Sequence, residues 1–320
     1  MKYCPGSTRI SLSGIILLKA LTVIPTVYAA EQPQVAELEI AGGVIAALKN
    51  DTLTVEMLSA YFEKNSELLR NNIQQGLGRY KTDTVGETVT MNFEKYIQNK
   101  DRIISNWDKF ASAKDRVSEK IAATFGEDIP AVVLVPCVGL MANGGWADNI
   151  DGTHYIFVAL EIIPPQIDIG ALLVHEITHA ISEVGWDILL DGLYNEGYAT
   201  YVSYELSPGM PFSVYFMMSP DMLANCYTWM NDNRETMAAD SGKPLAVMND
   251  MHKFYLTTSF TDYPNLGYVV GFEYIKHLRK THTLEELRTF AMDVDANRAA
   301  FTEFLKNAEF GAETVVAPGN

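Results

Sequence analysis

The chain has 320 residues, a formal net charge of −16 and 48% apolar residues, so it has a globular composition and is long enough for one large domain or two small ones. The acidic balance argues against nucleic acid as a partner, because phosphate binding needs clustered Lys and Arg side chains. It also argues against docking on an anionic membrane surface.

The first thirty residues have the pattern of a secretory signal peptide. A basic start precedes an apolar stretch over residues 10–27, and small side chains flank a cut after Ala29. The alternative is an uncleaved anchor helix. Lys19 and Pro25 argue against it, because a membrane span needs about 20 consecutive apolar residues. We therefore expect a secreted or periplasmic protein that has no stable membrane association once residues 1–29 are removed.

Two cysteines remain after that cut, Cys137 and Cys226. An oxidising compartment would allow them to pair. Two buried thiols are an equal alternative.

The segment after the signal, residues 30–125, has a helical pattern. The clearest example is a set of apolar residues spaced along one helical face, namely Ile103, Trp107, Phe110, Val117 and Ile121. Breakers at Gly126 and Pro130 end this region.

Residues 126–210 are expected to form the core of the protein. Short apolar runs between turn signals predict two strands, and apolar periodicity after Asp168 predicts two helices. The expected order is a strand at 131–136, a Gly-rich loop at 143–146, a strand at 154–160, a helix from 168 to 185 and a helix from 188 to 205.

The remaining residues, 211–320, again read as mostly helical, and Thr283 with Glu286 predicts a capping box. The layout predicts an α+β fold that is mostly helical and contains a small mixed sheet. Nothing marks a linker, so we expect one compact unit with two lobes.

The most informative stretch is a His-Glu-x-x-His motif inside the first central helix. His175 and His179 are four residues apart, so both rings project from one face of the helix. Two such imidazoles can bind one zinc ion, and Glu176 can reach a water on the metal as general base. With 6 His and 22 Glu in the chain, chance produces the motif about 0.008 times. The alternative is a helix that carries these two histidines without a metal ion. It would bury two imidazoles and a carboxylate among apolar residues, which is costly without a partner.

A catalytic zinc ion normally has three protein ligands. Glu196 lies 17 residues after His179, within the second central helix, and Gly197 and Ala199 permit close packing there. A turn near Gly185 would bring this helix antiparallel beside the first, so Glu196 is the expected third ligand.

These motifs, Val174 to Ala180 followed by Asn195-Glu196-Gly197, resemble the thermolysin-like gluzincin clan of zinc metallopeptidases. The second motif is similar to the Asn-Glu-Gly of the aminopeptidase N type. Size and spacing most resemble a family of predicted zinc-dependent proteases once catalogued as a domain of unknown function. The resemblance implies that His175, His179 and Glu196 are zinc ligands and that Glu176 is the general base. It also implies that an edge strand, here Thr153–Leu160, holds the substrate backbone.

The sequence departs from the clan at two places. Thr200 stands where thermolysin-type enzymes have an acidic residue, so a carboxylate that orients a ligand His must come from elsewhere, with Asp191 and Glu183 as candidates. Ala159-Leu160-Glu161 is only a faint echo of the strand with which aminopeptidases read the substrate amine. Exopeptidase specificity therefore does not follow.

Tyr268 is the candidate for stabilising the oxyanion. Tyr268 with Gly271 is similar to the Tyr-x-x-Gly of aminopeptidase-type gluzincins, and the glycines would let this helix approach the zinc helices closely. An ordinary core tyrosine is an equal alternative, and Tyr263 is the fallback. The weaker candidates for site residues, none of which belongs to a motif, are His154, His252, His277, His282 and Trp146.

The sequence thus predicts a secreted or periplasmic zinc metallopeptidase that acts on a peptide or protein substrate. A narrow-specificity aminopeptidase-type hydrolase and a non-catalytic peptidase-like binding module are the alternatives. The intact Glu176 argues against the binding module, because a structural zinc site needs no general base. The oligomeric state is left open.

Overall fold

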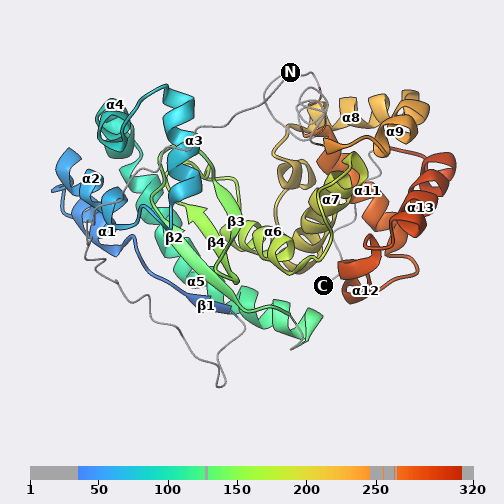
Figure 1. The fold of residues 1–320 in the computed structure, drawn as a ribbon, viewed down its shortest axis with the longest axis horizontal. Coiled ribbons are helices and arrows are strands. Elements are labelled where there is room, and N and C mark those ends of the chain that lie inside the picture. The colour runs from blue at the N-terminus through green and yellow to red at the C-terminus, as the bar shows by residue number, and fades with distance from the viewer. Residues whose placement is uncertain (1–34, 127–128, 246–254, 256–262, 264, 312–320) are drawn as a thin grey trace, which may run out of the picture. The chain divides into compact units, whose positions relative to one another are not determined.

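The computed structural model describes residues 35–126, 129–245, 255, 263 and 265–311 (Figure 1). All of them belong to one compact unit that spans residues 33–320. The expected signal peptide, residues 1–29, and His252 lie outside the described residues.

The N-terminal region consists of one short strand followed by five helices. In chain order these are β1 (Val35–Glu37), α1 (Gly42–Lys49), α2 (Val55–Lys64), α3 (Arg70–Tyr80), α4 (Val85–Gln98) and α5 (Lys100–Phe125). The helical pattern is confirmed, and α5 buries Ile103, Phe110, Val117 and Ile121 on one face, with Trp107 half-buried beside them. The expectation that the helical pattern covers all of residues 30–125 is wrong at β1, because three extended residues carry too short a pattern to be recognised.

The sheet has four strands in the order β1-β2-β4-β3. It is small and mixed, as the sequence predicts. The strands β2 (Val132–Cys137) and β4 (Thr153–Ala159) pair in parallel, and β3 (Gly145–Ile150) pairs antiparallel with β4. Two expectations are corrected. Thr153–Leu160 is not an edge strand, because β4 pairs on both sides. The edge strands are β1 and β3, and β3 begins inside the expected Gly-rich loop.

The central helices are α6 (Ile169–Ile181) and α7 (Leu189–Leu206). The Asp168 carboxylate accepts a hydrogen bond from the Ala171 backbone N–H at 2.8 Å and so caps α6, as its sequence predicts. The helix ends four residues before the expected Gly185, because Ser182 is extended and Arg288 donates to the carbonyl of Ile181 at 3.4 Å.

The C-terminal region is helical where the structure describes it. It contains η1 (Phe212–Phe216), α8 (Pro220–Asp232), α9 (Arg234–Ser241), α11 (Leu266–Leu278), α12 (Leu284–Phe290) and α13 (Val294–Asn307). The capping box of Thr283 and Glu286 is confirmed. Within the described ranges, none of the helices combines the length and the apolarity that a membrane span requires.

The backbones of α7 and α11 touch at two glycines. A Cβ atom on Gly197 would lie 2.1 Å from the backbone of Gly271, and one on Gly271 would lie 1.9 Å from the carbonyl oxygen of Leu193. Only residues without a side chain fit at this crossing. The expected close approach of this helix is thereby confirmed, and it places Tyr268, one turn before Gly271, near Glu196.

The two cysteines are free and buried, Cys137 in β2 and Cys226 in α8. Of the two alternatives, the structure has the pair of buried thiols.

Candidate metal centre

The structure brings together the three residues expected to be metal ligands. The Nε2 atoms of His175 and His179 lie 3.1 Å apart, and Glu196 Oε2 lies 3.4 and 3.3 Å from them. The two histidines stand one turn apart on α6, and Glu196 comes from the adjacent α7. This His-His-Glu group could hold a metal ion.

A buried amide fixes the turn that joins the two helices. Asn195, next to Glu196 in sequence, donates to the carbonyls of Val184 and Gly185 at 3.3 and 2.8 Å and accepts from the Ser182 hydroxyl at 3.0 Å. The side chain therefore holds the backbone after α6 against the start of α7, which sets the separation between the histidines and Glu196.

The two imidazole Nε2 atoms and Glu196 Oε2 all point to the centre of the group. Because each of them carries a lone pair, a positive charge between them would stabilise the arrangement. Glu196 Oε2 is buried and has no hydrogen-bond partner among the described residues. Burial alone would raise the pKa of Glu196, but the two imidazoles outweigh it and hold that pKa well below its usual range. Burial would lower the pKa of His179, but Glu196 and Glu176 outweigh it and raise that pKa. Either a proton or a metal ion can supply the missing charge.

Glu176 is buried, with 8% of its surface exposed, and it faces the start of the edge strand β3. A Cβ atom on Gly145 would lie 2.8 Å from Glu176 Oε1. A side chain at position 145 would therefore displace this carboxylate. Burial raises the pKa of Glu176, and the two histidines oppose the shift.

Tyr268 lies at the same site. Its ring stacks on the His175 ring at 6.1 Å between centroids, with 9° between the planes. Burial, followed by the carboxylates of Glu196 and Glu176, raises the pKa of the phenol well above its usual value, so the group keeps its proton and can donate. Tyr263, the fallback, instead lies against Trp229.

Two cavities meet at the candidate metal centre, and both are lined by Gly145, His175, Glu176 and Tyr268. The first, of about 510 Å³, is mostly polar in character and runs along β3 past Trp146, Asp148, His154 and Trp186. The second, of about 450 Å³, is apolar, with walls that include Ile162, Ile163, Leu172, Val214 and Met217.

The carboxylates expected to orient a ligand histidine lie elsewhere, which corrects that expectation. Asp191 accepts from the backbone N–H groups of Asp187 and Ile188 and so caps α7. Glu183 pairs with Arg288 at 2.6 Å. Both therefore stabilise helix ends rather than the imidazoles.

Of the weaker candidate residues, some lie at this site and others lie elsewhere in the fold. His154 and Trp146 line the first cavity, although Trp146 also stacks on Phe157 at 4.6 Å. His277 and His282 pack against phenylalanine rings away from it. Sequence reasoning missed Trp186, which is 47% exposed and stands 6.0 Å from the His179 ring. No motif marks it, because it lies in the irregular segment between α6 and α7.

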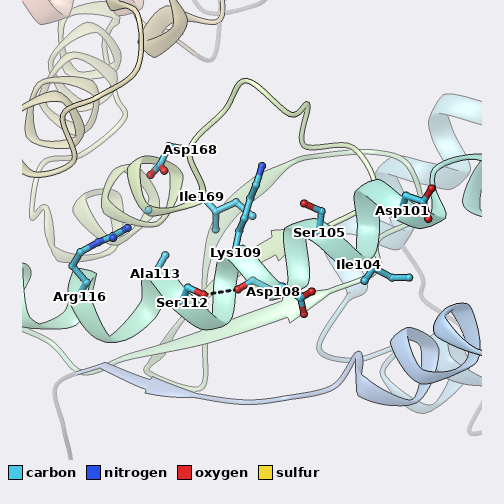
Figure 2. A pocket seen from close by; sticks show the side chains of 11 residues that line it. Asp101, Ile104, Ser105, Asp108, Lys109, Ser112, Ala113, Arg116, Asp168 and Ile169 are labelled. Carbon is cyan, nitrogen blue, oxygen red and sulfur yellow. Dashed lines mark hydrogen bonds between the residues drawn. The ribbon is translucent and has the colours of Figure 1, made fainter.

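A third hollow, of about 550 Å³, lies between α5 and the start of α6 and shares no residue with the metal centre (Figure 2). Its charges have both signs, with Lys109 and Arg116 facing it beside Asp101, Asp108 and Asp168. It brings no catalytic combination of residues together and is not a candidate active site.

Comparison with known proteins returned no matching family model, no matching curated protein and no matching solved structure. The functional argument therefore rests on the geometry of the site.

Proposed function

We propose that the protein is a secreted or periplasmic zinc metallopeptidase with a thermolysin-like core. The observation that carries the proposal is the triangle of two imidazole nitrogens and one carboxylate oxygen, with edges of 3.1–3.4 Å, beside the carboxyl group of Glu176. Ligands about 2.0–2.1 Å from a tetrahedral zinc ion are about 3.3 Å apart, so the triangle suits zinc. Calcium and magnesium prefer sites made of oxygen ligands alone.

In this proposal His175, His179 and Glu196 hold the metal and Glu176 moves a proton. Bound zinc would supply a Lewis acid that makes water a nucleophile near neutral pH. Glu176 takes a proton from the water that attacks the peptide carbonyl carbon. It then passes the proton to the leaving nitrogen as the C–N bond breaks. The Tyr268 phenol donates to the negative oxygen that forms on the carbonyl.

The substrate in this proposal is an extended peptide or protein segment that pairs with β3. One side of β3 pairs with β4, and the strand ends the sheet, so its other side is the sheet edge. Such an edge can accept a further strand through backbone hydrogen bonds. Glu176 lines both cavities, and the apolar one offers room for a large apolar side chain of the substrate.

An exchange of one carboxylate for an amide tests the mechanism. Glu176→Gln should keep about one zinc ion per chain, measured by elemental analysis, because the three ligands remain. Hydrolysis of a broad pool of peptides should fall by about 10²–10⁴-fold, because the base is gone. The matched control is Glu235→Gln, the same change at an exposed position of α9, which should cleave like the parent.

Cleavage by Glu176→Gln at the parental rate would contradict the mechanism. A zinc-loaded parent that cleaves no member of the pool would instead favour the binding-module alternative.

A further inference from the structure

A second buried carboxyl group, Glu161, takes no part in the proposed chemistry and faces neither cavity. Its surface is fully buried. Glu161 Oε2 accepts from the backbone N–H of Gly139 at 2.9 Å, and Oε1 accepts from that of Met141 at 3.3 Å. The side chain thus binds a loop of this chain, so it does not read a substrate amine.

Three further buried side chains bind the same loop, residues 138–141, and with Glu161 we call them the buried polar cluster: Tyr61, Asn72 and Tyr96. The Tyr61 hydroxyl accepts from Val138 N–H at 3.2 Å, and the Asn72 amide oxygen accepts from Leu140 N–H at 2.6 Å. The Tyr96 hydroxyl donates to the carbonyl of Gly139 at 2.8 Å. Four successive backbone N–H groups are therefore satisfied by side chains rather than by secondary structure.

The cluster is itself held by α5. Asn106 donates to the carbonyls of Leu160 and Ile163 at 2.9 and 3.0 Å, and Arg102 donates to the carbonyl of Glu161. A Cβ atom on Gly139 would lie 2.9 Å from Glu161 Oε1. A side chain at position 139 would therefore displace the carboxyl group of Glu161 or the amide of Asn72.

The loop leads directly into the candidate active site. Three residues after Met141, the carbonyl of Gly144 accepts from the Ala159 N–H at 2.8 Å, and Gly145 then lies against Glu176. Asn143, Gly144 and Gly145 also line the apolar cavity. The cluster thus fixes one end of a short segment whose other end, at Gly145, lines both cavities.

We propose that Glu161 is a positioning residue, whose carboxyl group holds the loop at residues 138–141 and thereby sets the start of β3 against Glu176, ready to pair with a peptide. Burying a carboxyl group is expensive, and packing alone would be served as well by an apolar side chain. The two backbone hydrogen bonds give the carboxyl group a task that an apolar side chain could not perform. The consequence for catalysis rests on the proposed function.

Three variants test this role. Glu161→Gln keeps the shape but replaces one acceptor oxygen with an amino group, so one loop N–H loses its partner. Tyr96→Phe removes only the hydroxyl that donates to the carbonyl of Gly139 and keeps the buried ring. It therefore tests the same cluster if Glu161→Gln does not fold. Asp240→Asn is the control, because it neutralises a buried carboxyl group in α9 that lines neither cavity.

Hydrogen exchange gives the readout that does not depend on activity. In the zinc-loaded protein, the amides of residues 138–145 should exchange faster in Glu161→Gln and in Tyr96→Phe than in the parent, while Asp240→Asn leaves them unchanged. Unchanged exchange in both cluster variants would overturn the proposal.

Inhibitor binding separates positioning from general loss of structure. Acetohydroxamate needs only the metal, so its affinity should be unchanged, whereas a peptide hydroxamate that also pairs with β3 should bind about 10- to 100-fold more weakly to Glu161→Gln. Zinc content should stay at the parental value. Equal weakening of both inhibitors, or parental affinity for the peptide hydroxamate, would overturn the proposal. A parent that binds both inhibitors but cleaves nothing would instead remove the proposed function and leave this test intact.

Discussion

The crossing of α7 and α11 gives a sharp prediction, because Gly271→Ala adds a single carbon atom where there is no room. The new Cβ would lie 1.9 Å from the carbonyl oxygen of Leu193 and 2.8 Å from the Cα of Gly197. Both neighbours are helix backbone and cannot rotate away. An ordinary contact is at least about 3.4 Å, so the helices must separate by about 1.5 Å.

The expected loss follows from that separation. Overpacking of a buried interface costs about 1–3 kcal/mol, and a shift shared by two whole helices belongs at the upper end. The better helix propensity of Ala returns only about 1 kcal/mol. We therefore expect a net loss of about 2 kcal/mol and, for a unit of this size, a Tm lower by about 3 °C. Zinc affinity should also fall, because α7 carries Glu196 and α11 carries Tyr268.

Calorimetry of the zinc-free and zinc-loaded forms measures both effects. The control is Gly78→Ala in α3, where the added Cβ meets nothing within 4 Å. This exposed helical position should gain about 0.5–1 kcal/mol, so the same substitution should shift Tm in opposite directions at the two sites. A Tm for Gly271→Ala at or above the parental value would refute the reasoning.

Four further predictions concern the site, the carboxyl groups and export. Glu196→Gln should lower zinc occupancy markedly, and full occupancy by elemental analysis would place the third ligand elsewhere. Tyr268→Phe should bind zinc normally while kcat falls by roughly 10²–10³; a change confined to KM or to Tm would assign the residue to binding or packing. Burial raises the pKa of Glu161 from 4.5 to about 7, so the folded state binds more protons than the unfolded state between those values. Stability should therefore fall as pH rises through this window, by up to about 3 kcal/mol, and urea unfolding should show that Glu161→Gln lacks this part of the slope. N-terminal sequencing of exported protein should begin at Ala30 or Glu31, and Met1 on a cytoplasmic product would contradict the export prediction.

Local patterns predicted those parts of the fold that depend on neighbouring residues. The strand at 131–136, the N-cap at Asp168, the helix α7 and the capping box at Thr283 each follow from a few adjacent side chains. The proximity of His175 and His179 is likewise a property of one helix. Glu196 required a guess about how two helices pack, and small residues after it supplied the hint.

Features that depend on distant partners were missed. The strand β3 contains Gly145, Asp148 and Asn149, which are poor strand formers, and it is extended because it pairs with β4. The end of α6 depends on Arg288, more than 100 residues later, which binds the carbonyl of Ile181. The roles expected for Asp191 and Glu183 were wrong for the same reason, since Asp191 binds the backbone at the start of α7 and Glu183 pairs with the distant Arg288.

The contact between Gly197 and Gly271 joins segments that the ribosome makes at different times. A nascent chain that has reached Leu206 already carries both histidines, Glu176 and Glu196, yet α7 still lacks the helix that covers it. Tyr268 and the rest of α11 must be synthesised before that face is buried. The order of synthesis therefore delays completion of the candidate active site until α11 has been made.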